Sequence, residues 1–264
     1  MPRIIVCLKQ AVDVTQIKID PTTRRLITAE TPRKISDFDK NALEEAVRIK
    51  EKLMGEVVAL TVSAEDAKTT LREALAMGAD KAYLVTDPSF QDSDALVTSY
   101  ILAQAVKKIG SFDIIFCGEA TIDSYSAQVG PRLAERLGIP VITYVRRLNL
   151  EGNHVVAERS LEDCFEVAKA RMPALITVTK EINEPRIPSL PAILKASKKE
   201  LVTWTLEDLG ISKEKAGTAG SSVQILEVLA PKVERKRVKI EGETPQEIAE
   251  KLARALIQEG VVGR

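Results

Sequence analysis

Residues 156–185 read VAERSLEDCFEVAKARMPALITVTKEINEP, and this stretch decides the fold assignment. An alternating apolar and polar run ends at Arg159, two acids follow at 162–163, and a second alternating run ends at Arg171. Alternation with period two on both sides of a polar turn predicts a β-hairpin. The uninterrupted apolar run 174–178 that follows predicts a fully buried strand.

Upstream of this stretch, strand-like and helix-like segments alternate. The expected strands are residues 4–8, 57–62, 82–85, 114–117 and 141–145. The expected helices are one that follows Asp39 and is ended by Gly55, then 64–77, 94–109 and one that ends near Leu137. Strands separated by helices require right-handed crossovers and give a mostly parallel sheet. The sequence therefore predicts an α/β fold with a doubly wound, Rossmann-like sheet and a hairpin insertion. A small hairpin around residues 20–23 is also expected.

Downstream of Pro185 the pattern becomes irregular. Residues 212–235 carry glycines and serines typical of a flexible arm, and a basic run spans 232–239. Thr244 is expected to cap an amphipathic helix over residues 245–258. This tail has too little apolar residue content for a core of its own. We therefore expect one α/β domain at residues 1–185 and, at 186–264, an extended arm and helix that do not form an independent domain.

The bulk composition excludes several functions. Lys plus Arg and Asp plus Glu both count 38, so the net charge is zero, which argues against binding nucleic acid or a membrane surface through global charge. Three scattered cysteines without a CxxC pair argue against disulfides and iron–sulfur clusters and fit a reducing compartment. No signal-peptide pattern or membrane-spanning run is present, so a cytoplasmic protein without direct membrane insertion is expected.

The strongest candidate site is the loop 118–130, GEATIDSYSAQVG, which follows a buried strand and opens a helix. In an open parallel sheet, ligands bind beyond the carboxyl ends of the strands. Small residues allow a phosphate to approach backbone N–H groups, and a helix N-terminus favours an anion. An ordinary polar loop before a capped helix explains the same residues equally well. Neither a GxGxxG nor a Walker A motif is present.

Catalytic and metal-binding groups are not expected. His154, the single histidine, lies in a turn region, where a surface position is the expected one. One histidine and scattered cysteines do not make a metal site, and no nucleophile motif accompanies them. Cys7 is expected to be a small core residue, because no histidine stands near it to activate a thiolate.

The hairpin and strand also resemble the signature region of the electron transfer flavoprotein β subunit. The matching residues are Ala157, Arg159, Glu162, Asp163, Glu166, Pro173, Leu175, Ile176 and Thr177. Cys164 and Ala168 depart from the family pattern, without evident chemical consequence. The resemblance extends from the first strand to the last helix.

The resemblance implies an adenine-nucleotide site in the loop, where Gly118, Ile122, Asp123 and Gln128 match the family as they stand. It adds walls from the first strand, the next loop and the second parallel strand. The implied cofactor-binding residues are Cys7, Lys9, Ser36, Asp37, Phe38, Asp39, Val62, Gly118, Glu119, Ala120, Thr121, Ile122, Asp123, Ser124, Tyr125, Ser126, Ala127, Gln128 and Val129. Lys9 read by itself is equally well a solvated lysine.

The family contains two types of β subunit, and the loop distinguishes them. In one type this site holds AMP as a structural ligand, while a single FAD lies mainly in the α subunit. In the other it holds a second FAD, which divides the two electrons of NADH between a high- and a low-potential acceptor. ATIDSYSAQVGP, residues 120–131, resembles the second, fix-type form. Residues 35–42, 202–204, 230–232 and 240–242 also resemble fix-type chains. FAD is therefore favoured, with AMP as the alternative.

The fix-type resemblance implies a set of partners. These are an α subunit in an obligate heterodimer, a ferredoxin-like low-potential carrier, and a flavoprotein dehydrogenase that passes electrons to a quinone. Membrane association is then expected only through these partners. The assembled complex would oxidise NADH, with flavin rather than protein acid–base groups supplying the redox chemistry.

Leu190 matches the exposed leucine with which the family docks redox partners. A short buried helix start after Pro191 is the competing interpretation, and the two are close to equal. A nucleotide-binding regulatory module of the universal-stress type shares the doubly wound sheet. It does not account for the hairpin or for the chain beyond Pro185.

Overall fold

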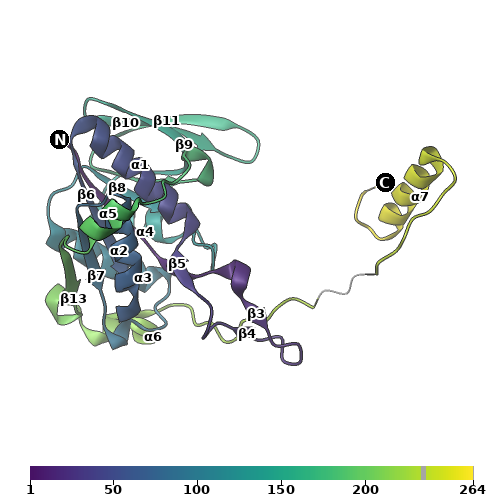
Figure 1. Cartoon of the computed structure of the whole chain (residues 1–264), viewed down its shortest axis with the longest axis horizontal. Helices are drawn as coiled ribbons and strands as arrows, with labels where there is room; N and C mark the ends of the chain where they lie inside the picture. The colour runs from purple at the N-terminus through teal and green to yellow at the C-terminus, as the bar shows by residue number, and fades with distance from the viewer. Residues whose placement is uncertain (233–235, 264) are drawn as a thin grey trace. The chain divides into compact units, whose positions relative to one another are not determined.

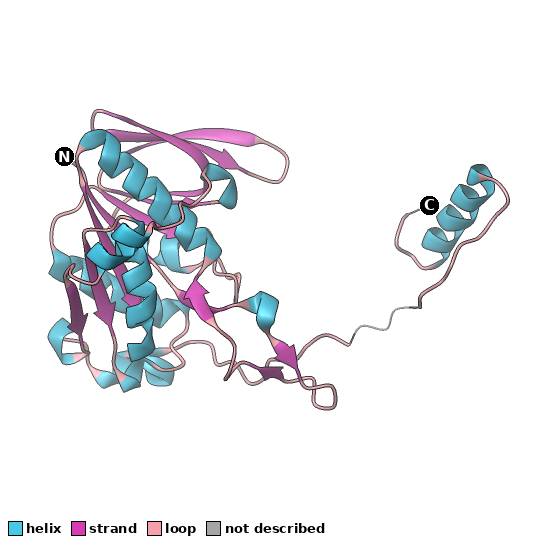
Figure 2. Cartoon of the chain, in the orientation of Figure 1, coloured by secondary structure: helices cyan, strands magenta, loops and turns pink. Residues whose placement is uncertain are grey.

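The computed structural model describes residues 1–232 and 236–263. The chain divides into two compact units, Met1–Val228 and Leu229–Arg264. The first unit is built around one central sheet, drawn in Figures 1 and 2. Its strands are β1 (Arg3–Cys7), β6 (Glu56–Val62), β7 (Lys81–Val85), β8 (Ile114–Gly118), β9 (Val141–Glu151), β10 (His154–Ser160), β11 (Phe165–Arg171), β12 (Ala174–Val178) and β13 (Leu201–Trp204).

Among the described residues the sheet has the order β11-β10-β9-β12-β8-β1-β6-β7-β13. The pairs from β9–β12 through to β7–β13 are parallel. The pairs β9–β10 and β10–β11 are antiparallel. The predicted, mostly parallel sheet is confirmed, and β1 and β8 stand side by side in its middle.

Helices cover both faces of this sheet because side chains alternate along each strand. On one face, α1 (Asp37–Leu53) and α2 (Lys68–Met77) pack on a core that includes Ile4 and Val6. On the other, α3 (Ala95–Ile109) and α4 (Val129–Leu137) pack on a core that includes Ile5 and Cys7. This arrangement is the predicted doubly wound fold. The helix expected from residue 64 begins at Lys68, after the 3-10 turn η2 (Glu65–Ala67).

The predicted hairpin is formed by β10 and β11, with His154 opposite Arg171 and Ser160 opposite Phe165. It extends the central sheet instead of standing apart from it. The reason is that β9 runs on past Val145, pairing first with β12 and then with β10. Tyr144 lies close to this change of partner, in a backbone conformation with a positive φ of 57°.

The remaining elements of the first unit are short. β2 (Gln10–Val12) pairs with β5 (Arg33–Ile35), and β3 (Lys18–Ile19) with β4 (Leu26–Ile27), the latter being the predicted small hairpin. The short helices are η1 (Val14–Gln16), η3 (Pro88–Phe90), η4 (Lys180–Ile182), α5 (Leu190–Ala196), η5 (Glu207–Leu209), η6 (Lys213–Lys215) and α6 (Gly217–Gly220).

The first unit continues past Pro185, where the sequence places the end of the α/β domain. β13 pairs in parallel with β7, Leu201 opposite Ala82, and forms the sheet edge. The Trp204 ring lies 4.5 Å from the ring of Tyr83 on β7. Because this strand and α5 pack on elements of the first half, the compact unit ends at Val228 and not at residue 185.

The second unit contains α7 (Pro245–Gln258). The predicted Thr244 cap is confirmed, since its hydroxyl oxygen accepts a hydrogen bond from the Glu247 N–H at 3.2 Å. Residues 233–235 of the basic run lie outside the described residues. Within the described parts of the chain, no helix has the length and apolar character needed to cross a membrane.

Candidate functional site

The site is built around Asp39, which connects the carboxyl ends of β1 and β8. One carboxylate oxygen of Asp39 accepts a hydrogen bond from the Lys9 N–H at 2.8 Å, and the other from the Gly118 N–H at 2.9 Å. The side chain lies in the first turn of α1 and is only 5% exposed. Burial raises the pKa of its carboxyl to about 7, against the lowering effect of the two N–H donors. Asp39 thus joins two strand ends and one helix.

Two glycines let the chain pack closely at this edge. A Cβ atom on Gly118 would lie 2.6 Å from an Asp39 carboxylate oxygen and 2.6 Å from the Phe38 Cβ. A Cβ atom on Gly130, in the first turn of α4, would lie 2.6 Å from the Thr177 Cγ2. Both positions therefore require glycine for steric reasons. The loop between them lies directly on the strand ends.

An ion pair ties this loop to β1. The Lys9 ammonium lies 2.8 Å from the Asp123 carboxylate, and the Thr121 hydroxyl donates to the same carboxylate at 2.7 Å. Burial alone would raise the pKa of Asp123, but the bonds from Lys9 and Thr121 leave it lowered. The Ser36 hydroxyl accepts from the Ile122 N–H at 3.3 Å. Lys9 is thus a paired lysine and not a freely solvated one.

Aromatic side chains stand beside the loop. The rings of Phe38 and Tyr125 meet edge to face at 5.7 Å, and the Lys180 ammonium lies 5.1 Å from the Phe38 ring centre. Tyr125 is 64% exposed, has a positive φ of 49°, and donates its hydroxyl to Glu119 at 3.2 Å. A strained backbone that holds an exposed aromatic ring is a common feature of ligand sites.

Other predicted residues have structural partners. The sulfur atoms of Cys7 and Cys117 lie in the core, where the two residues are 7% and 5% exposed. Asp37 pairs with Lys34 at 3.0 Å and with Lys180 at 3.3 Å. Gln128 accepts from Arg132 within the start of α4. Cys7 therefore has the core position that its chemistry predicts.

The last predicted residues lie within the loop or at its edges. Val62 ends β6, Ala120 is 6% exposed, and Val129 begins α4. The hydroxyls of Ser124 and Thr121 form a hydrogen bond with each other at 2.9 Å. The backbone of Ala127, next to Ser126, has a positive φ of 53°.

Sequence reasoning missed Lys180 and Tyr144, which surround the same edge. The Tyr144 N–H donates to the hydroxyl of Thr177 at 3.2 Å. Thr177 is one of the signature residues, and its place in that pattern is the one sequence feature that marks it as important. Lys180 follows the buried strand in sequence, and nothing local indicates that it lies over Phe38.

The groups gathered at this edge are hydroxyls, carboxylates, an ammonium and aromatic rings. The described residues contain no cluster of metal-ligating side chains. The ion pair, the hydroxyls of Ser36, Thr121 and Ser124, and the close packing at the two glycines gather polar groups at the carboxyl edge of the sheet, where doubly wound folds bind their ligands. Fold and site together define a doubly wound α/β protein with a polar, glycine-bounded loop at the carboxyl edge of its sheet.

Comparison with known proteins gives the family. Residues 23–209 match the model of the electron transfer flavoprotein domain. The electron transfer flavoprotein subunit beta of Thermoanaerobacterium thermosaccharolyticum is 44% identical over 88% of this chain and 89% of its own. The caffeyl-CoA reductase-Etf complex subunit CarD of Acetobacterium woodii is 38% identical over 98% and 100%. Protein FixA of Azorhizobium caulinodans is 40% identical over 86% and 84%.

The chain therefore belongs to the electron transfer flavoprotein family, as a β subunit of the FixA-like type. The family assignment expected from the signature region is confirmed. It also decides against the universal-stress module, which lacks the hairpin.

Proposed function

We propose that this chain holds a second FAD in its carboxyl-edge site and takes part in flavin-based electron bifurcation from NADH. The acceptors are a ferredoxin-like or flavodoxin-like low-potential carrier and, through a flavoprotein dehydrogenase, a quinone. The observation that carries the proposal is the loop closed by Asp39 and by the Lys9–Asp123 pair. A relative aligned over 98% of this chain is named as a subunit of a reductase–Etf complex, which supports a role in a larger redox assembly.

The residues present fit the adenosine diphosphate part of a dinucleotide. Gly118 and Gly130 let the loop pack closely on the strand ends, which places its polar groups at the carboxyl edge of the sheet, where doubly wound folds bind nucleotides. Phe38 and Tyr125 offer aromatic surface beside them. The bound flavin supplies the hydride and single-electron chemistry; the protein binds it, orients it and sets its electrostatic surroundings.

Partner subunits complete this function. Electron transfer flavoprotein β subunits pair with an α subunit, and we infer an obligate heterodimer here. The docking contact is assigned to α5, where Leu190 is 70% and Leu194 63% exposed. The competing buried helix start does not agree with these exposures. Exposed Lys195 and Lys198 flank the apolar side chains, which fits a dehydrogenase surface with an apolar hollow and an acidic rim.

The test is the nucleotide content of the complex purified with its native partners. Bound nucleotides are released with acid, and FAD and AMP are quantified per α–β pair. Two FAD and no AMP are expected. One FAD with one AMP overturns the proposal and leaves a structural ligand in this chain. The variant Asp123→Asn assigns the second FAD, because it is expected to lose one FAD of the two while the α subunit keeps the other.

A further inference from the structure

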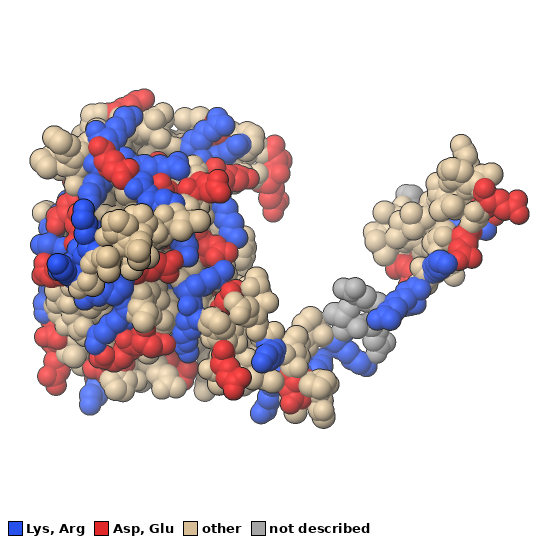
Figure 3. Space-filling view, viewed as in Figure 1, with Lys and Arg blue, Asp and Glu red and all other residues tan. Residues whose placement is uncertain are grey.

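The segment Ile187–Leu194 presents apolar side chains to solvent, and its short helix has one local cap, the Ser189 hydroxyl, which accepts from the Ala192 N–H at 3.4 Å. Ile187 is 93% exposed and Ile193 50%, and of the residues in α5 only Ala196 is buried. On the face drawn in Figure 3, uncharged side chains gather over α5. A helix of seven residues is unstable in isolation. Contacts at the two ends of the segment must therefore hold it.

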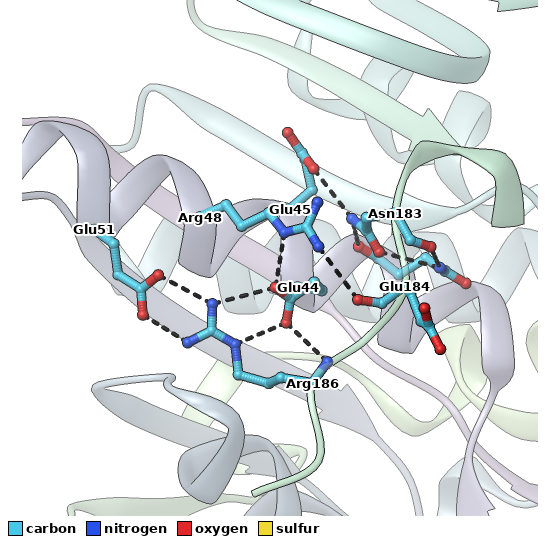
Figure 4. Close-up of polar contacts among 8 residues, drawn as sticks. Glu44, Glu45, Arg48, Glu51, Asn183, Glu184 and Arg186 are labelled. Carbon is cyan, nitrogen blue, oxygen red and sulfur yellow. Dashed lines mark hydrogen bonds and ion pairs between the residues drawn. The ribbon is translucent and has the colours of Figure 1, made fainter.

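Arg186 anchors the beginning of the segment to α1. Its Nε donates to Glu44 at 2.8 Å, and its backbone N–H donates to the same oxygen at 3.1 Å. Its two terminal nitrogens also bind the Glu51 carboxylate at 2.6 and 3.0 Å, as a bidentate pair (Figure 4). The pKa of Glu44 is lowered because these bonds outweigh its burial. Bidentate arginine pairs fix orientation as well as position.

The residues just before Arg186 are fixed to the same helix. The Asn41 amide donates to the Asn183 carbonyl oxygen at 2.7 Å, and the Asn183 amide donates to the Asn41 carbonyl oxygen at 3.0 Å. Arg48 donates to the Glu184 carbonyl oxygen at 3.3 Å while it pairs with Glu44. The side chain of Glu44, 4% exposed, is thus shared between two arginines.

The far end of the segment is anchored to α2. Arg72 donates to the carbonyl oxygens of Ala196 at 2.8 Å and Lys199 at 2.9 Å. The Lys199 ammonium donates in return to the carbonyl oxygens of Leu75 at 2.9 Å and Ala79 at 2.6 Å. Charged hydrogen bonds therefore hold both ends, while the apolar side chains between them stay free.

Burying the Glu44 carboxylate carries a desolvation cost, and apolar packing would attach the segment at least as stably. What directional bonds add is a single orientation of the chain. A segment that is already ordered loses less conformational entropy when it binds a partner, so its affinity is higher. We propose that Arg186, held by Glu44 and Glu51, is a positioning residue that keeps the apolar segment Ile187–Leu194 in its binding conformation for the flavoprotein dehydrogenase.

This inference rests on the proposed docking function of α5, and the experiment separates the two. The variant Arg186→Lys is made in the intact complex; it keeps the positive charge but loses the bidentate geometry. Arg3→Lys is the matched control, because Arg3 pairs with Glu56 at 3.0 Å, and its side chain is 27% exposed against 33% for Arg186. Leu190→Ala and the double variant Arg186→Lys/Leu190→Ala complete a cycle.

The affinity of each variant for the flavoprotein dehydrogenase of the native complex is measured by surface plasmon resonance. If Arg186→Lys leaves a tenth of the molecules in the binding conformation, affinity falls about tenfold. Arg3→Lys should lower thermal stability by a similar amount but leave the affinity for the dehydrogenase unchanged. In the double variant, the effect of Arg186→Lys should largely disappear, because the contact that it positions is already gone. Amide exchange in α5 should rise in Arg186→Lys and not in Arg3→Lys.

Unchanged affinity in Arg186→Lys, with weakened binding in Leu190→Ala, overturns the positioning role and leaves the docking function standing. Unchanged affinity in Leu190→Ala overturns the docking function itself, and the positioning role with it. Fully additive losses in the double variant also contradict the inference, because Arg186 would then act independently of the segment.

Discussion

The Lys9 ammonium and the Asp123 carboxylate lie 2.8 Å apart, so an ion pair connects residues 114 positions apart in the sequence. Lys9 follows the strand β1, and Asp123 lies in the loop after β8. Because these strands are neighbours, the pair closes the loop over the strand ends. Its contribution to stability is expected to be small, since the side chains remain 43% and 24% exposed, and under the proposed function its role is to hold the binding loop in place.

Asp123→Asn is therefore expected to weaken nucleotide retention roughly tenfold or more, the usual effect of losing a hydrogen bond to a charged group. Thermal unfolding should change little, by less than about 1 kcal/mol, because the pair is solvent-screened. Nucleotide content after extended dialysis measures the first effect. Lys169→Gln, which breaks an exposed pair with Glu151 at 3.0 Å on the hairpin, is the control and should retain the nucleotide. Equal retention in both variants would contradict the role of the pair.

Asp39 is expected to make stability depend on pH. Its folded-state pKa of about 7 lies above the ordinary value of 3.8, so the fold favours the protonated carboxyl. Its contribution to stability is therefore fully present below pH 3.8 and is lost as the pH rises through about 7. The difference in free energy of unfolding between the native chain and Asp39→Asn should fall by up to about 4 kcal/mol across this window.

Urea unfolding at several pH values between 4 and 8 measures this difference. Subtraction of the Asp39→Asn curve removes the contribution of the other carboxyl groups. A difference that rises with pH would show that the two N–H donors outweigh burial and that Asp39 is ionised throughout.

Gly118→Ala is expected to destabilise the chain, because the added Cβ would lie 2.6 Å from both Asp39 and Phe38. Such overpacking against backbone and buried carboxylate costs about 1–3 kcal/mol. The free energy of unfolding in urea measures it, and nucleotide content should fall in parallel. Gly263→Ala, a site with no heavy atom within 4 Å of the added Cβ, should be neutral. A neutral Gly118→Ala would mean that the strand ends move apart easily.

Thr177→Val tests the contact with Tyr144. The substitution keeps the shape of the buried side chain but removes the hydroxyl that accepts the Tyr144 N–H. Leaving that donor without its partner should cost about 1–3 kcal/mol in the free energy of unfolding.

Thr179→Val is the matched control for this variant. In the described part of the chain the Thr179 hydroxyl is buried and has no hydrogen-bond partner. Its removal should therefore be neutral or slightly stabilising. Equal losses in both variants would show that volume, and not the hydrogen bond, decides the effect.

Local patterns predicted most of the first unit's strands and helices. The buried strand β12 (Ala174–Val178) has the predicted limits, because its uninterrupted apolar run identifies it without any partner. The helix α7 and its Thr244 cap were also predicted, since cap chemistry acts within one turn. The candidate loop was recognised by its position after a buried strand and by its resemblance to the family.

The sequence alone thus determined the elements, the fold class and the loop, because periodicity and capping act over a few residues. Only the tertiary structure decided the partners. β13 is four residues long, and no local pattern shows that it pairs with β7. Arg186 and Glu44 are 142 positions apart, and Asp39 binds the ends of two separate strands. A carboxylate can accept a hydrogen bond from any arginine or backbone N–H group, so residue type does not specify the partner. Chain topology determines which of these groups are brought together.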